Sequence, residues 1–107
     1  MKFKVLASGS KGNCTVIMTD EAKIIIDMGI SYQTLKKSLE EDSLSLNDFT
    51  GILITHCHKD HTNGLAVKHT KLKVYIPIKM YDSLKELISK DDCIFIEDNF
   101  KINDIKI

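Results

Sequence analysis

The chain has 107 residues, 43% of them hydrophobic and 28% charged, which allows one small globular domain and argues against disorder. Lys+Arg and Asp+Glu balance at 15 each, so the formal net charge is zero. The chain therefore has no overall positive charge that would indicate a nucleic-acid partner. The sequence contains no Arg, so a bidentate guanidinium clamp for phosphate is excluded within these residues.

The cysteines and the N-terminus indicate the compartment. Cys14, Cys57 and Cys93 are odd in number, widely spaced and form no Cys-x-x-Cys pair, which argues against a disulfide framework. The N-terminus is too short and too polar after Ala7 to be a signal peptide, and no apolar run is long enough to cross a bilayer. We therefore expect a cytoplasmic protein with reduced thiols and no membrane partner.

The first third of the chain predicts three short strands. Residues 2–7 alternate and lead into small and polar residues at 8–13, which are typical of a turn. Residues 14–19 are rich in Thr, Val and Ile, and residues 23–27 contain three consecutive Ile, so both segments are typical of β-strands. Three consecutive short strands predict an antiparallel meander.

A helix is predicted after the third strand. Ser31 offers an N-cap, and Tyr32, Leu35 and Leu39 recur at helical spacing. Residues 42–49 are polar apart from two Leu, so we expect a loop there with room for one helical turn.

The second half of the chain predicts alternating strands and helices. The first strand of this half is a compact apolar run, which suits a strand buried on both faces. The last helix has a clear apolar stripe, and the final residues form a hairpin pattern with Asn103 and Asp104 as its turn. The predicted strands span 51–55, 74–76 and 93–96, the helices 62–69 and 80–88, and the hairpin 100–107.

A meander followed by β-α alternation predicts a layered α/β sheet, which has to be covered on both faces. The predicted helices are too few for that, so one sheet face is expected to stay apolar and uncovered. Two explanations remain open. Either a few long side chains and the short helix suffice, or a second half that is missing from this chain packs on that face.

The segment after the buried strand concentrates side chains that bind metal. His56, His58 and His61 are three of the chain's four histidines, and Asp60 lies among them. The alternative is a chance cluster on a solvated loop, but this spacing argues against it. Residues two apart in extended chain point the same way, so His56 and His58 share a side and Cys57 faces the other, as a small buried hydrophobe rather than a nucleophile. Imidazole and carboxylate together suit zinc and related divalent ions.

The pattern at residues 55–61, His-x-His-x-Asp-His after an apolar strand that ends in Thr, resembles the signature of metallo-β-lactamase-fold hydrolases. Residues 24–29 resemble that family's upstream strand-Asp-x-Gly motif. The opening, residues 6–13, resembles the YycJ/WalJ-type branch, whose members look like DNA-directed exonucleases. The resemblance implies an α/β fold, namely the N-terminal half of the metallo-β-lactamase αββα sandwich, with a β-meander followed by β-α units in a mixed sheet.

The resemblance also implies roles for individual residues. His56 and His58 would bind a first metal, and Asp60 and His61 a second, with Zn²⁺ expected and Mn²⁺ or Fe²⁺ as alternatives. Asp60 would in addition be the catalytic residue that orients the attacking oxygen. Asp27 would hydrogen-bond the metal loop without binding metal. The alternative for Asp27 is a strand-end Asp that caps a turn.

The chain departs from the family pattern in one respect. The complete fold supplies three further ligands, a His, a metal-bridging Asp and a final His, and this chain does not contain them, since His69 lies too early. Residues 1–107 are therefore expected to be the N-terminal, metal-motif half of a domain whose C-terminal half is absent. The enzyme is expected to act when full length, while this segment alone lacks the complete site.

The function expected from these features is metal-dependent hydrolysis, by a phosphodiesterase or nuclease that uses a hydroxide activated by two divalent metals. Its partner would be DNA or another phosphodiester. The alternatives are a thioester or lactone hydrolase of the same fold, and a non-catalytic truncated metal-binding or assembly fragment that dimerises through the uncovered sheet face. Ser8, Ser10 and Asn13 are candidates to bind substrate phosphate near the metals, although a plain hairpin turn is the competing interpretation.

Overall fold

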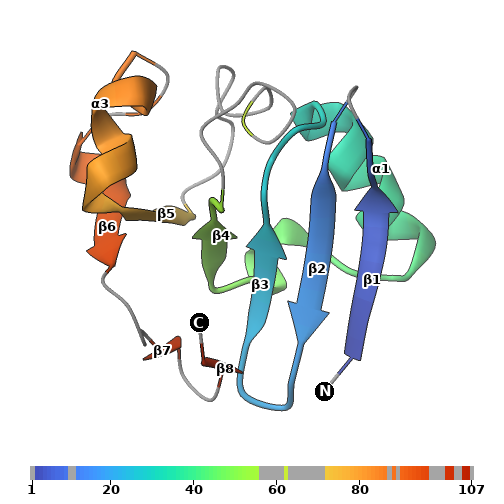
Figure 1. Ribbon diagram of the computed structural model, residues 1–107. Helices are drawn as coiled ribbons and strands as arrows, with labels where there is room; N and C mark the ends of the chain where they lie inside the picture. The colour runs from blue at the N-terminus through green and yellow to red at the C-terminus, as the bar shows by residue number, and fades with distance from the viewer. Residues whose placement is uncertain are drawn as a thin grey trace.

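The computed structural model describes residues 2–9, 12–55, 62, 72–86, 88, 90–96, 101–102 and 105–106. Its centre is a six-stranded mixed sheet in which the strands lie in sequence order (Figure 1). Two further strands form a separate antiparallel pair. The strands of the sheet are β1 (Lys2–Ala7), β2 (Cys14–Met18), β3 (Lys23–Ile26), β4 (Gly51–Leu53), β5 (Lys73–Pro77) and β6 (Cys93–Ile96), and the pair is β7 (Lys101–Ile102) and β8 (Ile105–Lys106).

The antiparallel meander predicted for the first third of the chain is confirmed. β1 pairs with β2 and β2 with β3, both antiparallel, with a bulge between Val5 and Ala7. The turn between β2 and β3 is closed by Thr19, whose hydroxyl accepts a hydrogen bond from the Ala22 N–H at 3.0 Å. β1 and β3 therefore run in the same direction, which brings the residues after them to one edge of the sheet.

The second half of the sheet is parallel, as the β-α alternation predicts. β3, β4, β5 and β6 pair in that order, with Ile25 opposite Ile52 and Leu53 opposite Tyr75. β4 is buried along its whole length, which confirms the strand predicted to be covered on both faces. The first residue of β4, Gly51, lies directly against the Tyr75 ring. A glycine fits there because a Cβ would contact that ring.

The helix predicted after Ser31 is confirmed as α1 (Tyr32–Glu41). The Ser31 side chain accepts a hydrogen bond from the Thr34 N–H at 3.1 Å, and Leu35 and Leu39 are buried. In the loop that follows, a single helical turn forms as η1 (Leu46–Asp48), held by a reciprocal capping box between Ser45 and Asp48.

The helix predicted for residues 80–88 is shorter than expected. The structure has a 3₁₀ turn, η3 (Ile78–Met80), followed by α3 (Tyr81–Leu84), and a second 3₁₀ turn, η4 (Lys90–Asp92), leads into β6. Leu84 and Ile88 are nonetheless buried, and the Ile88 N–H donates to the Leu84 carbonyl at 3.1 Å. The apolar stripe thus packs on the sheet as expected, but the chain has to turn back to begin β6, and this ends the regular helix early. Thr62 is the one residue of the predicted 62–69 helix that lies within the described part of the chain, and it is buried.

Side chains on the two faces of the sheet form separate apolar clusters. One face packs Val16, Ile25, Ile52 and Val74 against residues of α1, η1 and α3. The other face carries a smaller cluster, and its members are Ala22, Ile24, Leu53 and Ile96.

The prediction of an uncovered apolar face is wrong at the centre of the sheet. Ile24 and Leu53 lie on the face away from the helices, yet they are 0% and 4% exposed. Exposed apolar side chains on that face occur at the edge strand β1, where Phe3 and Val5 are 71% and 54% exposed.

The hairpin predicted for the last residues is confirmed by the antiparallel pairing of β7 with β8, in which Ile102 lies opposite Ile105. Its predicted turn, Asn103 and Asp104, lies outside the described residues. Within the described part of the chain, no helix has the length and apolar character needed to span a bilayer.

Candidate functional site

Three loops that carry the sequence motifs leave the sheet at the same edge. The arrowheads of β1, β3 and β4 point to one end of the sheet (Figure 1), as their pairing requires. The residues after β1, β3 and β4 are therefore neighbours, although they are far apart in the chain. In open α/β sheets, the carboxyl ends of parallel strands are where ligand sites form.

Asp27 is the buried charged residue at this edge. It follows β3 directly, is 5% exposed and adopts a left-handed backbone conformation with φ of 64°. Its carboxylate accepts a hydrogen bond from the Thr55 N–H at 2.7 Å and another from the Thr55 hydroxyl at 2.6 Å. The Asp27 N–H donates to the Leu53 carbonyl at 2.7 Å. A non-glycine residue in this conformation costs about 1–3 kcal/mol, so the surrounding hydrogen bonds have to hold it there.

The loop between β1 and β2 folds on itself and against the residues after Asp27. The Asn13 side chain bonds both backbone groups of Gly9: its Oδ1 accepts from the Gly9 N–H at 3.2 Å and its Nδ2 donates to the Gly9 carbonyl at 2.9 Å. The Gly29 N–H in turn donates to the Asn13 carbonyl at 2.9 Å. Ser8 is exposed beside this closed loop, whereas Ser10 lies outside the described residues.

Cys14 lies beneath this edge and is 1% exposed. Burial, together with the negative charge of Asp27, raises the pKa of the Cys14 thiol to about 12. The side chain is therefore a neutral, buried thiol and not a nucleophile at neutral pH. Cys14 and Cys93 are both free thiols, in keeping with the prediction of no disulfide for these two cysteines.

The four predicted metal ligands, His56, His58, Asp60 and His61, lie outside the described residues, as does Cys57. The part of the chain that the structure does describe contains no group of three or more His, Cys, Asp or Glu side chains placed to hold a metal. What the structure does show is the residue next to the motif: Thr55 precedes His56 and is held by the buried Asp27 carboxylate. Three imidazoles and a carboxylate that follow such an anchored residue form a donor set that fits a divalent metal.

Two contacts at this edge could not be predicted from the sequence. Thr55 is recognisable as the last residue of an apolar strand, but its pairing with Asp27 depends on the parallel contact of β3 and β4. Gly12 packs against Gly29, and a Cβ added at Gly12 would lie 2.6 Å from the Gly29 carbonyl oxygen. The only sequence feature that indicates this contact is the presence of glycine at both positions.

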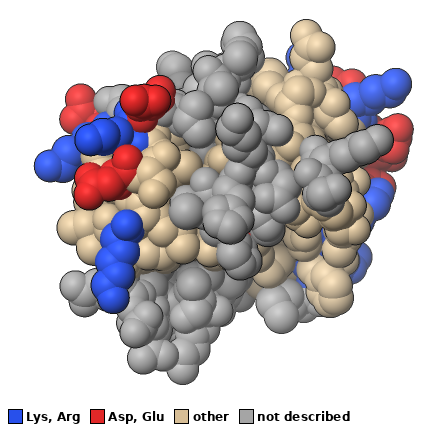
Figure 2. Space-filling model, turned by 45° about the horizontal axis from the view of Figure 1, so that its top comes forward, with Lys and Arg blue, Asp and Glu red and all other residues tan. Residues whose placement is uncertain are grey.

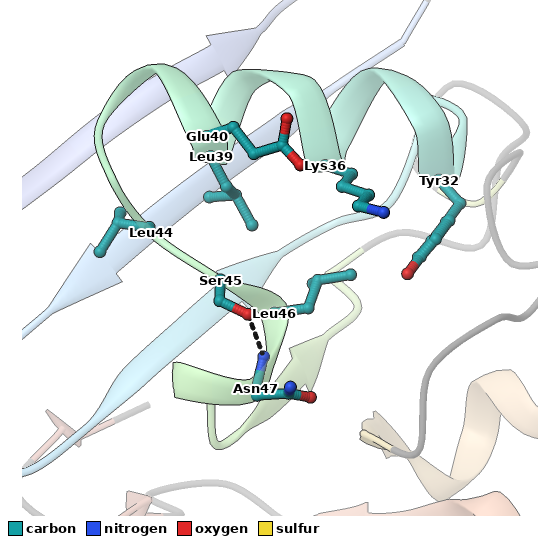
Figure 3. A pocket seen from close by; sticks show the side chains of 8 residues that line it. All are labelled: Tyr32, Lys36, Leu39, Glu40, Leu44, Ser45, Leu46 and Asn47. Atoms are coloured by element: carbon teal, nitrogen blue, oxygen red, sulfur yellow. Dashed lines mark hydrogen bonds between the residues drawn. The ribbon is translucent and has the colours of Figure 1, made fainter.

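A cavity of about 300 Å³ lies elsewhere, between α1 and the segment that follows it (Figure 3). Ser45 lines it, and its hydroxyl accepts a hydrogen bond from the Asn47 N–H at 3.3 Å, which closes the start of η1. Asp27, Ser8 and Asn13 are not part of its lining, so the cavity is separate from the edge described above. The residues that line it are Tyr32, Lys36, Leu39, Glu40, Leu44, Ser45, Leu46 and Asn47.

Charged side chains of both signs are intermixed on the face that Figure 2 shows. Blue and red side chains gather together at its two sides, and neither side carries one sign alone. Within the described residues visible there, the surface matches the balanced composition and has no continuous basic patch.

Known proteins match this chain in sequence and in fold. A family model described as Anti-Pycsar protein Apyc1 matches residues 6–93. The chain is 39% identical over 110 residues to exodeoxyribonuclease YycJ of Bacillus anthracis, in an alignment that covers 99% of this chain and 40% of the relative. It is also 39% identical over 66 residues to exodeoxyribonuclease WalJ of Streptococcus pneumoniae, covering 62% of this chain and 24% of that protein.

Among solved structures, MEM-A1, a subclass B3 metallo-β-lactamase isolated from a soil metagenome library, aligns with a TM-score of 0.74 at 18% identity. That alignment covers 97% of this chain and 47% of MEM-A1. The likeness confirms the predicted metallo-β-lactamase α/β fold, and the two nucleases confirm the resemblance to the YycJ/WalJ branch. The chain spans about 40% of the length of the first of these relatives.

Proposed function

Because the chain belongs to the Anti-Pycsar protein Apyc1 family and has the metallo-β-lactamase fold, we propose that it carries the metal-binding motif of a metal-dependent hydrolase that cleaves phosphodiester bonds in DNA. The observation that carries the proposal is the Asp27 carboxylate, which holds the Thr55 N–H and hydroxyl directly before the His-x-His-x-Asp-His motif. The names of the two relatives, both exodeoxyribonucleases, support DNA as the substrate.

In this proposal His56 and His58 hold one divalent metal, and Asp60 and His61 hold a second. Zn²⁺ fits this set of imidazole and carboxylate ligands best, with Mn²⁺ or Fe²⁺ as alternatives. When bound, the metals would supply positive charge for the phosphate oxygens and activate water for attack on phosphorus. Asp60 would also accept a hydrogen bond from the attacking water and so direct it at the phosphorus.

The remaining residues at this edge would position the metal motif and the substrate. Asp27 fixes where the motif begins, because its two hydrogen bonds hold both donors of Thr55. Groups that hydrogen-bond metal ligands orient them and raise metal affinity, and Asp27 would act one step further out, on the residue before the first ligand. Ser8 is exposed at the same edge and is the candidate to contact substrate phosphate, with Ser10 as a second candidate.

The proposal is tested with the intact gene product on 5′-phosphorylated single-stranded DNA, in the presence of Mn²⁺ or Zn²⁺. Release of nucleotides that stops on chelation, and that is lost in His58→Ala and Asp60→Asn, is the expected result. Lys79→Ala, which changes an exposed residue of η3, is the matched control and should keep full activity. Turnover of a thioester or lactone without any DNA cleavage would remove the nuclease assignment and leave the fold's other hydrolase class. Metal binding without any turnover would support the non-catalytic alternative.

Three further expectations stay predictions. The first is that residues 1–107 form the N-terminal, metal-motif half of a longer domain, and the coding sequence downstream of codon 107 tests it. Dimerisation through the sheet face on which Phe3 and Val5 are exposed is tested by light scattering. A cytoplasmic location is supported by the free thiols of Cys14 and Cys93, and fractionation tests it.

A further inference from the structure

We propose that Gly9, Gly12 and Asn13, in the loop between β1 and β2, form a brace for the metal motif, in which Asn13 and Gly12 are positioning residues that keep Asp27 directed at Thr55. This inference rests on the proposed function, since it assigns the loop to the support of the same metal site. It differs from the expectation that Asn13 and the loop backbone contact substrate phosphate.

The loop is closed by its own hydrogen bonds. Asn13 occupies both backbone groups of Gly9, and the Gly12 N–H donates to the Gly9 carbonyl at 3.3 Å. The N–H groups of Gly9 and Gly12 are therefore engaged inside the loop and are not turned outward as donors for an anion. Gly9 has a φ of 116°, a conformation that glycine adopts without the steric cost of a side chain. The described residues of the loop thus have the hydrogen bonding of a closed turn.

The closed loop is pressed against the backbone that follows Asp27. A Cβ at Gly12 would lie 2.6 Å from the Gly29 carbonyl oxygen and 3.1 Å from the Gly29 carbonyl carbon, so the two main chains are in direct contact. The Gly29 N–H donates to the Asn13 carbonyl at 2.9 Å. Gly29 is therefore held by one hydrogen bond and by one close contact from the same loop.

Fixing Gly29 fixes Asp27, which lies two residues earlier. The left-handed backbone of Asp27, with φ of 64°, persists only if the chain is held on both sides. On one side the Asp27 N–H is bonded to Leu53, and on the other the brace holds Gly29. The direction of the Asp27 carboxylate, and hence its contact with Thr55, then depends on the loop.

The experiment measures hydrogen exchange of the Thr55 amide by NMR in the metal-free protein, with the Ile25 amide in the buried centre of the sheet as the internal reference. Gly12→Ala adds a methyl group against the Gly29 carbonyl, and we expect Thr55 exchange to rise about tenfold or more beyond any change at Ile25. Lys37→Ala, which changes an exposed residue of α1 that takes no part in the brace, is the control. It should change Thr55 exchange by less than about threefold relative to Ile25.

Asn13→Ala adds no atoms and removes both bonds to Gly9, so it tests the brace if Gly12→Ala does not fold. It should raise Thr55 exchange in the same selective way, and Asn13→Asp, which keeps the acceptor for the Gly9 N–H, should restore part of the protection. We also expect both brace variants to weaken Zn²⁺ binding about tenfold in competition with a chelator.

Equal acceleration at Thr55 and Ile25, or equal effects of Lys37→Ala and Gly12→Ala, would overturn the brace. The exchange readout needs neither metal nor substrate. A protein that cleaves no DNA but shows selective exchange at Thr55 would therefore refute the proposed function and leave the brace standing. A confirmed nuclease with unchanged exchange would do the reverse.

Discussion

Asp27 and Thr55 are 28 residues apart in the chain, yet one carboxylate of Asp27 receives both hydrogen-bond donors of Thr55. Asp27→Asn leaves a single oxygen for these two donors, so one of them loses its acceptor. We expect metal affinity to fall about 10- to 100-fold, because the proposed ligands that follow Thr55 would lose the hydrogen bonds that hold the start of their segment. Competition with a chelator, followed by titration calorimetry, measures the change.

Asp20→Asn is the control for this substitution, since it removes the same charge from an exposed turn. Its metal affinity should match that of the unaltered protein. Unchanged affinity in Asp27→Asn would mean that Asp27 merely caps a turn at the end of β3.

Gly51 and Tyr75 pack so closely across β4 and β5 that the glycine cannot accept a side chain without movement of the ring. Gly51→Ala should therefore lower the free energy of unfolding by about 1–3 kcal/mol, the usual cost of overpacking. Urea unfolding followed by circular dichroism measures it. In a Tyr75→Ala background the same substitution should cost less, and a double-mutant cycle with no coupling would show that the ring does not limit this position.

The buried thiol of Cys14 should resist modification in the folded protein. Its pKa is raised to about 12 by burial and by the charge of Asp27, so the reactive thiolate is scarce at pH 8. We expect thiol reagents to label Cys14 at least about a hundredfold more slowly in the folded protein than in urea. Mass spectrometry of the labelled peptides measures the rates, and rapid labelling of folded Cys14 would show that the thiol is accessible.

The same raised pKa has a consequence for stability. The unfolded chain releases the Cys14 proton near pH 8.5, while the folded chain keeps it until about pH 12. Stability is therefore unaffected below about pH 8 and declines as pH rises above that value, by roughly 1 kcal/mol at pH 9.5. Cys14→Ala should remove this part of the decline, whereas Cys93→Ala should retain it, in urea unfolding at pH 7.5 and 9.5.

Ser31 caps α1 by accepting a hydrogen bond from the Thr34 N–H at 3.1 Å. Ser31→Ala should lower the free energy of unfolding by about 1 kcal/mol, because that N–H loses its acceptor. Ser31→Asp, which also caps helices well, should restore stability, and thermal unfolding measures both. Equal stability of Ser31→Ala and the unaltered protein would show that solvent replaces the cap.

Features that depend on neighbours in the chain were predictable from the sequence. Local spacing and residue type predict the strands β1 and β2, the cap at Ser31 with Leu35 and Leu39 one and two turns on, and the short hairpin of β7 and β8. The resemblance around residues 24–29 and 55–61 likewise needed only the order of residues, and it led to the right fold.

The length of α3 and the covering of the second face were not predictable in this way. The apolar stripe from Met80 to Ile88 continues beyond the point where the helix ends, because the chain has to return to β6. Ile24 and Leu53 are buried although too few helices were predicted to cover their face, since burial depends on what packs there and not on the strand itself.

The sequence by itself determined the candidate metal motif, the antiparallel meander of the first three strands and the start of α1, since these depend on residue types at short separations. The tertiary structure decided what holds Thr55, the residue directly before that motif. Parallel pairing of β3 with β4 places Asp27 against Thr55, and the packing of Gly12 on Gly29 holds the backbone beside it. Both contacts join residues far apart in the chain, and spacing along a sequence carries no information about which distant backbones approach within hydrogen-bond distance.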